Sequence, residues 1–503
     1  MKMKKYIIVI VMGCSMITSC KKILDVNTDP DNANASQATP QLVFPAAVAS
    51  SAGRIGGDLA ILGGIWAQHY TQNTTSSQYR AIDAFNLSKT DFGATTLSSP
   101  WAELYSGALN DLNFVIKKAE EQKNWNYLLM GTVVKAYTLQ SLVDIYDQVP
   151  YTEAFQGAAN LTPHFDDGYT VYQGLLAEID AALEKDFGAS SNAPAGNADF
   201  IFPDAATTWS IAPWIKFANT LKLKMYMRMV YAKPAEAEAG IKTLYTSGAE
   251  FLDQDAKMDI FEDAPDKSNP FYEYNFRKLN TDANLKASYT FLSWLEQNGD
   301  PRVDNYFSPK TGGTPTQFLA IHQGDYLNTD ATFNSASKAR VLATDPVDFL
   351  SLAESHFLQA EALERFFAGA GAKEQYDAGV TASFERNGDD AVPFIAANGR
   401  YEYPAAGSFE QKLEAIITQK WASLPGSHSL EAFFERNRTG YPKTSTVYST
   451  NVAYVPGQFV YPKNGVTNGA FAKRLIYPDI ERSKNPNTPP EEPVTKKVWW
   501  DVR

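Results

Sequence analysis

The stretch Trp101-Ala-Glu-Leu-Tyr-Ser-Gly-Ala-Leu-Asn-Asp-Leu-Asn-Phe-Val115 has the periodicity of an α-helix. Its apolar residues recur every three or four positions, which places them on one face of a helix with 3.6 residues per turn. Ser99 and Pro100 come just before it, as a capping residue and a first-turn proline do. Because a helix with one apolar face must bury that face against another element, this stretch predicts a helical scaffold.

Further helices are predicted on both sides of this stretch by the same periodicity. They cover residues 125–143, 171–183, about 213–229, 349–367 and 409–423. The last of them is preceded by Ser408, and Gln411 follows three positions later, which is the pattern of a capping box. Methionine and aromatic residues spaced along these helices are expected to form the core rather than a cofactor site.

Long polar stretches rich in Gly, Asn, Asp, Pro and Ser separate the predicted helices. The main ones are residues 188–208, 253–287, 301–346 and 426–478. Loops of this length in a compact domain are usually functional or carry small hairpins. We therefore expect a mostly α fold with long irregular loop insertions and a few short hairpins. No linker separates two cores, so residues 41–503 are predicted to form a single domain.

The composition excludes some classes of partner. The chain has 503 residues, with 45 Lys and Arg against 57 Asp and Glu, and a net charge of −12. This acidic balance argues against nucleic acid, whose binding depends on clustered cations, and against an electrostatic grip on anionic lipid. Aromatic residues make up 13% of the chain, which suits both a large core and a carbohydrate binder.

The N-terminus predicts export and lipidation. Lys2, Lys4 and Lys5 precede a short apolar run that is too short to span a bilayer, as in a secretory signal. The run ends in Ile17-Thr-Ser-Cys20, which resembles the lipobox of bacterial lipoproteins. We expect a signal peptide at residues 1–19 and a lipidated tether at 20–40, with acylation at Cys20. An ordinary secreted protein with a chance cysteine is the alternative.

No motif of a metal, cofactor or catalytic site is complete. Asp25-x-Asn27-x-Asp29 imitates the start of a calcium loop, but Pro30 and Ser36 occupy positions that need Gly and a carboxylate. The five histidines lack the spacing of a zinc protease, and nucleophile-elbow, phosphate-loop and dinucleotide motifs are missing. We therefore predict a non-catalytic protein that uses no metal and no cofactor.

Two acids stand out in the predicted helix at 349–367. Glu354 and Glu361 lie there among apolar residues, where a buried carboxylate needs partners. Nearby Arg or Lys residues are expected to supply them, so a structural role is favoured over a pair of catalytic carboxylates.

Two stretches combine aromatic residues with polar side chains, as sugar binding requires. Sugars present C–H faces that stack on aromatic rings, and hydroxyl groups that pair with amide, carboxylate and guanidinium groups. The first stretch, residues 66–79, contains the predicted ligand-binding residues Trp66, Tyr70, Asn73 and Tyr79, and the second, residues 269–277, contains Tyr272, Tyr274 and Arg277. The alternative is that Trp66 and Tyr70, four positions apart, lie on a buried helical face. His322 and Tyr326 are weaker candidates.

Eight short motifs occur in an order and spacing typical of one family. They are Asp25-Val-Asn-Thr-Asp-Pro-Asp-Asn32, Leu142-Val-Asp-Ile-Tyr-Asp-Gln-Val-Pro-Tyr151, Asp300-Pro-Arg302, Glu354-Ser-His-Phe-Leu-Gln-Ala-Glu-Ala362, Gln419-Lys-Trp421, Arg438-Thr-Gly-Tyr-Pro442, Lys473-Arg-Leu-Ile-Tyr-Pro478 and Val498-Trp-Trp-Asp501. With them, the chain resembles the SusD/RagB-type nutrient-binding lipoproteins of Bacteroidetes.

The resemblance implies both a fold and a partner. It implies tetratricopeptide-like helix pairs, a position on the outer membrane facing the cell exterior, and a SusC-like TonB-dependent transporter beneath. The implied function is to capture a nutrient, usually an oligosaccharide, and deliver it to that transporter. A lipid-anchored glycoside hydrolase and a peptide-binding lipoprotein are the alternatives.

Overall fold

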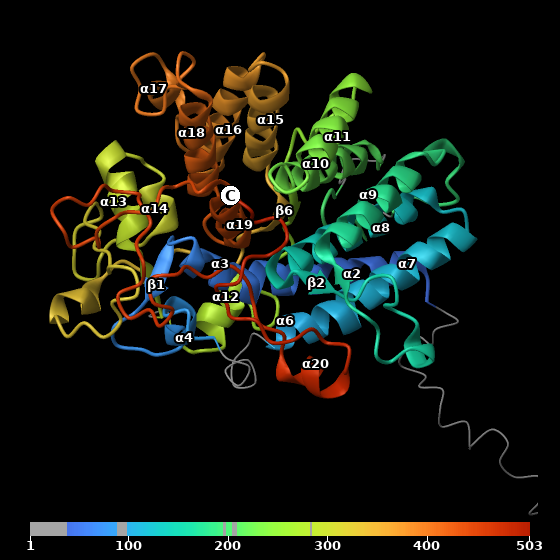
Figure 1. Cartoon of the computed structure of the whole chain (residues 1–503), viewed down its shortest axis with the longest axis horizontal. Coiled ribbons are helices and arrows are strands. Elements are labelled where there is room, and N and C mark those ends of the chain that lie inside the picture. The colour runs from blue at the N-terminus through green and yellow to red at the C-terminus, as the bar shows by residue number, and fades with distance from the viewer. Residues whose placement is uncertain (1–37, 88–97, 195–197, 204–208, 282–283) are drawn as a thin grey trace, which may run out of the picture.

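Helices dominate the computed structural model, which describes residues 38–87, 98–194, 198–203, 209–281 and 284–503 (Figure 1). The predicted signal peptide, Cys20, the calcium-like stretch and the first family motif lie outside these ranges. Consecutive long helices pack against one another, as α7 does on α8, α8 on α9, α10 on α11 and α15 on α16. The long helices are α2 Pro40–Arg54, α7 Asn110–Glu121, α8 Trp125–Tyr146, α9 Gly168–Leu183, α10 Ala212–Arg228, α11 Pro234–Thr246, α15 Leu352–Phe366, α16 Ala372–Arg386, α18 Phe409–Ser423 and α19 Ser429–Thr439.

Most of the predicted helices are confirmed. The stretch from Trp101 is helical, although a π-helical segment, η2 Leu104–Leu109, separates α6 Ser98–Glu103 from α7. The capping box of α18 is present, because Ser408 accepts from the backbone of Gln411 and the Gln411 side chain accepts in return. Helix α8 is buried on nearly every side and lies at the centre of the helical region.

Two predicted boundaries are wrong for a physical reason. Residues Val347–Leu350 form strand β6 rather than the start of a helix, since all four are buried and the strand pairs with β4 Ala256–Met258. Ser351 then caps α15. Helix α19 falls inside the predicted loop 426–478, because its second half, residues 435–439, is polar in sequence, although every residue of the helix is buried.

Strands are few and short among the described residues. Each forms a two-stranded antiparallel pair: β1 Tyr70–Gln72 with β5 Leu285–Ala287, β2 Gln148–Val149 with β3 Asp166–Asp167, and β4 with β6. The mostly helical fold class is therefore confirmed. None of the described helices combines the length and apolarity needed to cross a membrane.

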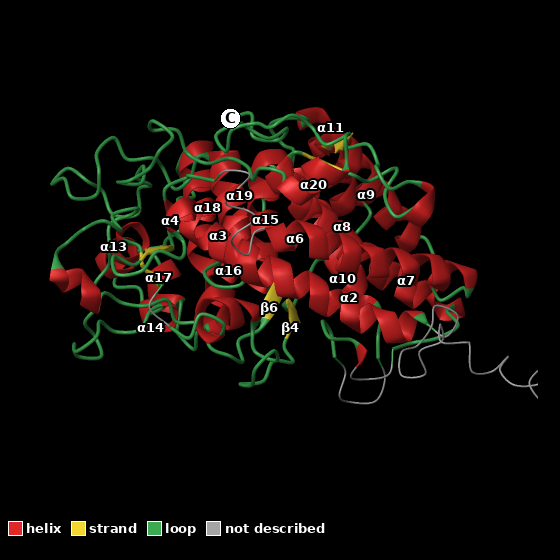
Figure 2. Ribbon diagram, turned by 90° about the horizontal axis from the view of Figure 1, so that it is seen from below, coloured by secondary structure: helices red, strands yellow, loops and turns green. Residues whose placement is uncertain are grey.

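Loops and short helices gather at one end of the molecule, away from the stacked long helices (Figures 1 and 2). The shorter elements include α3 Ala60–Trp66, α4 Arg80–Asp83, α12 Pro270–Tyr272, η6 Glu273–Arg277, α13 Tyr289–Asn298, α14 Val303–Tyr306, η7 Ala331–Ser335, α17 Val392–Ile395 and α20 Asp479–Lys484. Of these, α20 lies beside α6 rather than at the loop end. Helix α3 joins the two regions by packing on α19. A Cβ atom at Gly63 would lie 2.4 Å from the Leu430 backbone nitrogen, so only glycine permits this close approach.

Candidate functional site

The first predicted ligand stretch is buried. The ring of Trp66 is 3% exposed, contacts Phe85 and Phe433, and donates from Nε1 to the Ile82 carbonyl at 3.0 Å. Tyr70, Asn73 and Tyr79 are buried as well. These four side chains therefore present no open stacking face here.

The second predicted stretch meets the first and is more open. The Tyr79 hydroxyl donates to Asn275 Oδ1 at 3.1 Å, which joins the two stretches. Tyr272 and Tyr274 are half-buried. The Arg277 guanidinium lies 5.4 Å from the Tyr272 ring centre. Tyr274 borders a pocket of about 430 Å³ that Phe261 and Glu273 also line.

Cationic groups pack on the Tyr274 ring. The Arg54 guanidinium and the Lys278 ammonium lie 5.1 and 4.7 Å from its centre. Ligand contact by any of the seven predicted residues stays a prediction.

A second group of aromatic rings gathers in the loop region, and we call it the aromatic cluster. It consists of the half-buried residues Tyr289, His322, Phe333, Tyr448 and Tyr454. The His322 ring centre lies 4.4 Å from Tyr289, 6.0 Å from Tyr448 and 6.4 Å from Phe333. Tyr454 adds a contact of 5.9 Å to Tyr289. The start of α13 and two further segments, residues 322–333 and 448–454, thus bring flat rings to one place, and each of these residues is partly exposed.

Hydrogen bonds hold the rings of the aromatic cluster in place. His322 Nδ1 lies 2.8 Å from the Ser449 hydroxyl, and the Tyr448 hydroxyl donates to the Gln323 carbonyl at 2.8 Å. Burial lowers the pKa of His322, so this ring is neutral at pH 7. A hollow of about 310 Å³ opens beside Tyr448 and is also lined by Tyr461 and Lys463.

A buried set of polar side chains anchors these loops, and we call Gln68, Thr71, Asp83 and Gln323 the polar seam. Gln323 Nε2 and the Thr71 hydroxyl donate to the two Asp83 carboxylate oxygens at 2.6 and 2.7 Å. Gln68 accepts from Thr290 at 2.8 Å and donates to the Val460 carbonyl at 2.6 Å. The first predicted stretch therefore positions the segments that carry the aromatic cluster.

Asp83 is the charged member of the polar seam. Burial raises its pKa to about 6, although hydrogen bonds from Gln72, Thr71 and Gln323 act in the opposite direction. Its neutral and ionised forms thus exchange near physiological pH.

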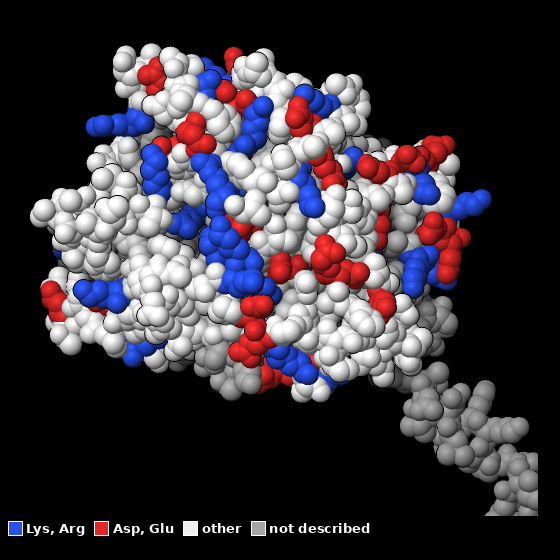
Figure 3. Space-filling view, viewed as in Figure 1, with Lys and Arg blue, Asp and Glu red and all other residues white. Residues whose placement is uncertain are grey.

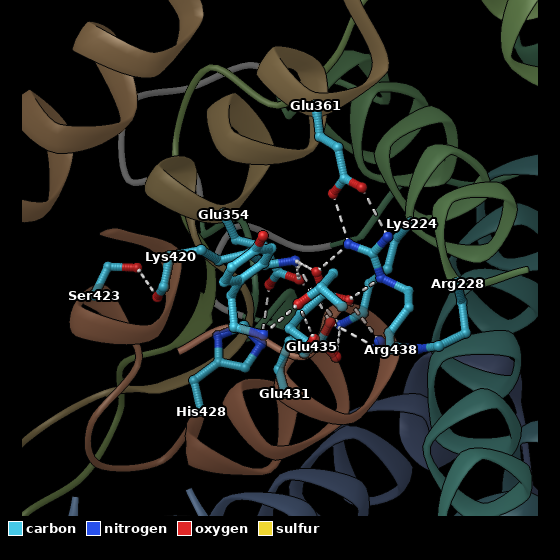
Figure 4. Close-up of polar contacts among 12 residues, drawn as sticks. Lys224, Arg228, Glu354, Glu361, Lys420, Ser423, His428, Glu431, Glu435 and Arg438 are labelled. Carbon is cyan, nitrogen blue, oxygen red and sulfur yellow. Dashed lines mark hydrogen bonds and ion pairs between the residues drawn. The ribbon is translucent and has the colours of Figure 1, made fainter. Parts of the chain in front are cut away.

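The two acids singled out in α15 belong to a buried ionic network (Figure 4). Glu354 lies 3.3 Å from the ammonium groups of Lys224 and Lys420 and 3.1 Å from His428 Nε2. Burial opposes ionisation of Glu354, but the charges of Lys224 and Lys420, together with the contact from His428, outweigh it and hold its pKa well below the usual range. The expectation of cationic partners is confirmed for this residue.

Arginines complete the ionic network. Arg438 donates two bonds to Glu361, at 2.6 and 2.8 Å, and Arg365 donates a third at 2.7 Å. Arg228 bonds Asp144 at 2.9 Å and Glu435 at 2.5 Å. These carboxylates are buried and each is held by cations. We therefore assign the arrangement a structural role in helix packing and no catalytic role. Among the residues that the structure describes, no group of three or more His, Cys, Asp or Glu could hold a metal ion.

Sequence reasoning missed most of the aromatic cluster. Tyr289, Tyr448 and Tyr454 belong to segments far apart in the chain, so no spacing rule connects them. The sequence feature that could have indicated them is the length of the polar loops 301–346 and 426–478, which carry four of the five residues. On the face shown in Figure 3, the loop end at the left carries fewer charged side chains than the middle of that face.

Comparison with known proteins now identifies the family. A family profile described as "Starch-binding associating with outer membrane" matches residues 59–462. The chain belongs to the SusD-like family. It is therefore a binding protein rather than an enzyme, and it associates with the outer membrane, as the earlier resemblance implied.

Solved structures share the SusD-like fold over nearly the whole chain. A SusD homolog from Bacteroides uniformis is 22% identical, with a TM-score of 0.73 over 92% of this chain and 99% of that one. A chitin-binding SusD homolog from Flavobacterium johnsoniae is 20% identical, with a TM-score of 0.74 and the same coverage. A chitin-binding protein is 25% identical, with a TM-score of 0.70 over 92% of this chain and 100% of the other. No curated protein matches the sequence.

Proposed function

We propose that this SusD-like protein is a cell-surface lipoprotein that binds an oligosaccharide and delivers it to a SusC-like TonB-dependent transporter. The observation that carries the proposal is the aromatic cluster. Its half-buried rings offer flat faces for the C–H surfaces of sugars, and the neutral His322 ring, whose Nδ1 pairs with the buried Ser449 hydroxyl, keeps Nε2 for a hydrogen bond to a sugar hydroxyl.

The ligand is expected to be an uncharged glycan. Two structural relatives are described as chitin-binding, so chitin oligosaccharides are the first probe and starch fragments the second. Tyr272, Tyr274 and Arg277 form an alternative or additional contact surface, because Tyr274 borders a pocket of its own.

Anchoring and delivery are expected to depend on parts outside the binding surface. Cys20 would carry the lipid, and residues 20–40 would tether the folded part, whose first described helix begins at Pro40. The transporter supplies the route across the membrane. A Cys20→Ala variant that still incorporates labelled palmitate would contradict the anchor. Tagged purification in mild detergent that never recovers a TonB-dependent barrel would contradict the partnership.

The binding proposal is tested by calorimetry with chitin and starch oligosaccharides. Replacing Tyr289 or Tyr454 by Ala should weaken binding about 5- to 150-fold, by analogy with aromatic stacking of about 1 to 3 kcal/mol on bases. The matched control is Tyr169→Ala, a half-buried tyrosine on α9, which should leave affinity unchanged. Equal affinity in Tyr289→Ala, Tyr454→Ala and the control would reject the aromatic cluster, and a loss confined to Tyr272→Ala or Tyr274→Ala would move the site there.

A further inference from the structure

A separate polar cavity lies where the helical region meets the loop region. Its volume is about 320 Å³, near the lower limit of ordinary ligand pockets. Groups from β4, β6, the 340–346 segment, the end of α16 and the turn between α18 and α19 line it. None of the five residues of the aromatic cluster borders it, so it is a different site.

The charges around this cavity favour an anion. Lys257, Arg340 and Arg386 face two carboxylates, in a chain whose net charge is −12. Arg386 is already engaged, because it donates to both oxygens of Asp348 at 2.9 and 2.7 Å. Arg340 and Lys257 are the cations with donors to spare.

The two less engaged cations make limited contacts of their own. Arg340 is exposed and uses one nitrogen, which donates to the Asp304 carbonyl at 2.6 Å and approaches Asn305 Oδ1 at 3.3 Å. Lys257 reaches a carboxylate of Asp259 at 3.5 Å. Both can therefore turn toward a ligand without breaking a buried bond.

One of the residues that line the cavity has a buried polar atom without a partner. His428 is 5% exposed, and its Nε2 lies 3.1 Å from Glu354, whereas its Nδ1 has no hydrogen-bond partner among the described residues. Leaving such an atom unpaired costs on the order of 1 to 3 kcal/mol. Nδ1 accepts from a hydroxyl when the ring is neutral and donates to an anion when the ring is protonated.

The carboxylates narrow the chemistry of the ligand. Asp345 accepts from the Leu342 backbone at 2.7 Å with one oxygen, and its other oxygen is an acceptor for a hydroxyl. These acids would repel a multiply charged anion such as phosphate, and a neutral sugar would leave Arg340 and Lys257 unused. We propose that this cavity binds a small sugar acid, with the carboxylate at Arg340 and Lys257 and hydroxyls at Asp345 and His428.

The experiment is calorimetric titration of the full folded chain with galacturonate, glucose and phosphate. Galacturonate should bind, and Arg340→Gln and Lys257→Gln should each weaken it about tenfold, the effect of losing one charge-assisted hydrogen bond. Lys118→Gln, on the exposed surface of α7, is the matched control and should bind like the parent. Tyr454→Ala should also leave galacturonate affinity unchanged, so this proposal and the glycan proposal can fail separately.

Several results would overturn the proposal. The first is that galacturonate does not bind, or binds the two substituted variants as tightly as it binds the control. The second is that glucose binds as tightly as galacturonate and is equally sensitive to Arg340→Gln, or that phosphate binds more tightly than galacturonate. The third is that Tyr454→Ala loses galacturonate binding. If the thermal transition shows that Arg340→Gln is unfolded, Lys257→Gln alone decides, since its side chain makes no buried bond.

Discussion

The ionic network of the helical region and the aromatic cluster of the loop region use opposite physical strategies. In the network, charged groups are removed from water and each is held by an opposite charge, as Arg438 is by Glu361 and Glu435. In the cluster, rings such as Tyr289 and Tyr454 stay half-buried, with part of each ring open to solvent. The first arrangement holds helices together, and the second leaves surface for a ligand.

Four of the eight family motifs contribute residues to the first arrangement. The ionic network contains five carboxylates and five Lys or Arg side chains, so its charges balance: Asp144, Glu354, Glu361, Glu431 and Glu435 against Lys224, Arg228, Arg365, Lys420 and Arg438. Asp144, Glu354, Glu361, Lys420 and Arg438 lie in motifs that carry the family resemblance. Membership of the family therefore predicts the helical scaffold much better than it predicts the ligand.

The largest effect is expected from breaking the ionic network. Arg438→Met should lower the free energy of unfolding by about 3 to 5 kcal/mol, because it leaves Glu361 and Glu435 buried with fewer cations. Urea unfolding measures the change. A loss below about 1 kcal/mol would mean that the network contributes little to stability.

The polar seam should produce a pH-dependent effect. The pKa of Asp83 is raised to about 6 in the folded protein, against about 3.9 when unfolded, so the folded state holds its proton more tightly. This stabilisation is complete below about pH 4 and is lost as pH rises to about 6. Relative to Asp83→Asn, which cannot titrate, the parent should lose about 2 to 3 kcal/mol of stability across that range.

Urea titrations at pH 4, 5, 6 and 7 test this difference. Asp259→Asn, on the exposed surface, is the matched control and should follow the parent at every pH. Parallel stability curves for the parent and Asp83→Asn would contradict the raised pKa.

The aromatic cluster should separate binding from stability. Tyr454→Ala is expected to change the free energy of unfolding by about 1 kcal/mol or less, because a half-buried surface side chain contributes little to the core. The same variant should show the large loss of oligosaccharide affinity described above. A loss of stability comparable to that of Arg438→Met would place Tyr454 in the scaffold instead.

The smallest effect is expected at an exposed ion pair. Lys242 and Glu238 are four residues apart on α11 and both are about half exposed. Lys242→Met should change the free energy of unfolding by about 0.3 to 0.5 kcal/mol, since solvent screens such pairs. This variant is also the control for Arg438→Met, and equal losses in the two would show that burial of the charges is unimportant.

Local patterns predicted much of the scaffold. Helices α8, α9, α10 and α18 each have a regular apolar spacing, and the capping box at Ser408 marks a boundary correctly. The same approach failed for α19, whose charged residues are buried beside its apolar ones. The apolar residues of α19 end at Phe434, and its second half, residues 435–439, is polar, so that half of the sequence resembles the loops around it.

The candidate site was predicted less well, because exposure is not a local property. Polar residues begin two positions after Trp66 in the sequence, yet Phe85 and Phe433 cover its ring. Tyr448 and Tyr454 have no distinguishing neighbours and become part of a cluster only when their loop meets Tyr289 and His322. The same limit applies to the cavity beside His428.

The sequence by itself determined the helical class, the family and the need for cations around Glu354 and Glu361. The helical class and the family follow from spacing and motifs along the chain, and the need for cations follows from the cost of burying a charge. None of the three requires knowledge of which distant segments meet. Only the tertiary structure decided which aromatic rings stay open and which charges meet. The exposure of a ring and the pairing of a charge depend on contacts between residues far apart in sequence. Arg228 with Glu435 and His322 with Tyr448 are examples, and only the packing of the chain brings these residues together.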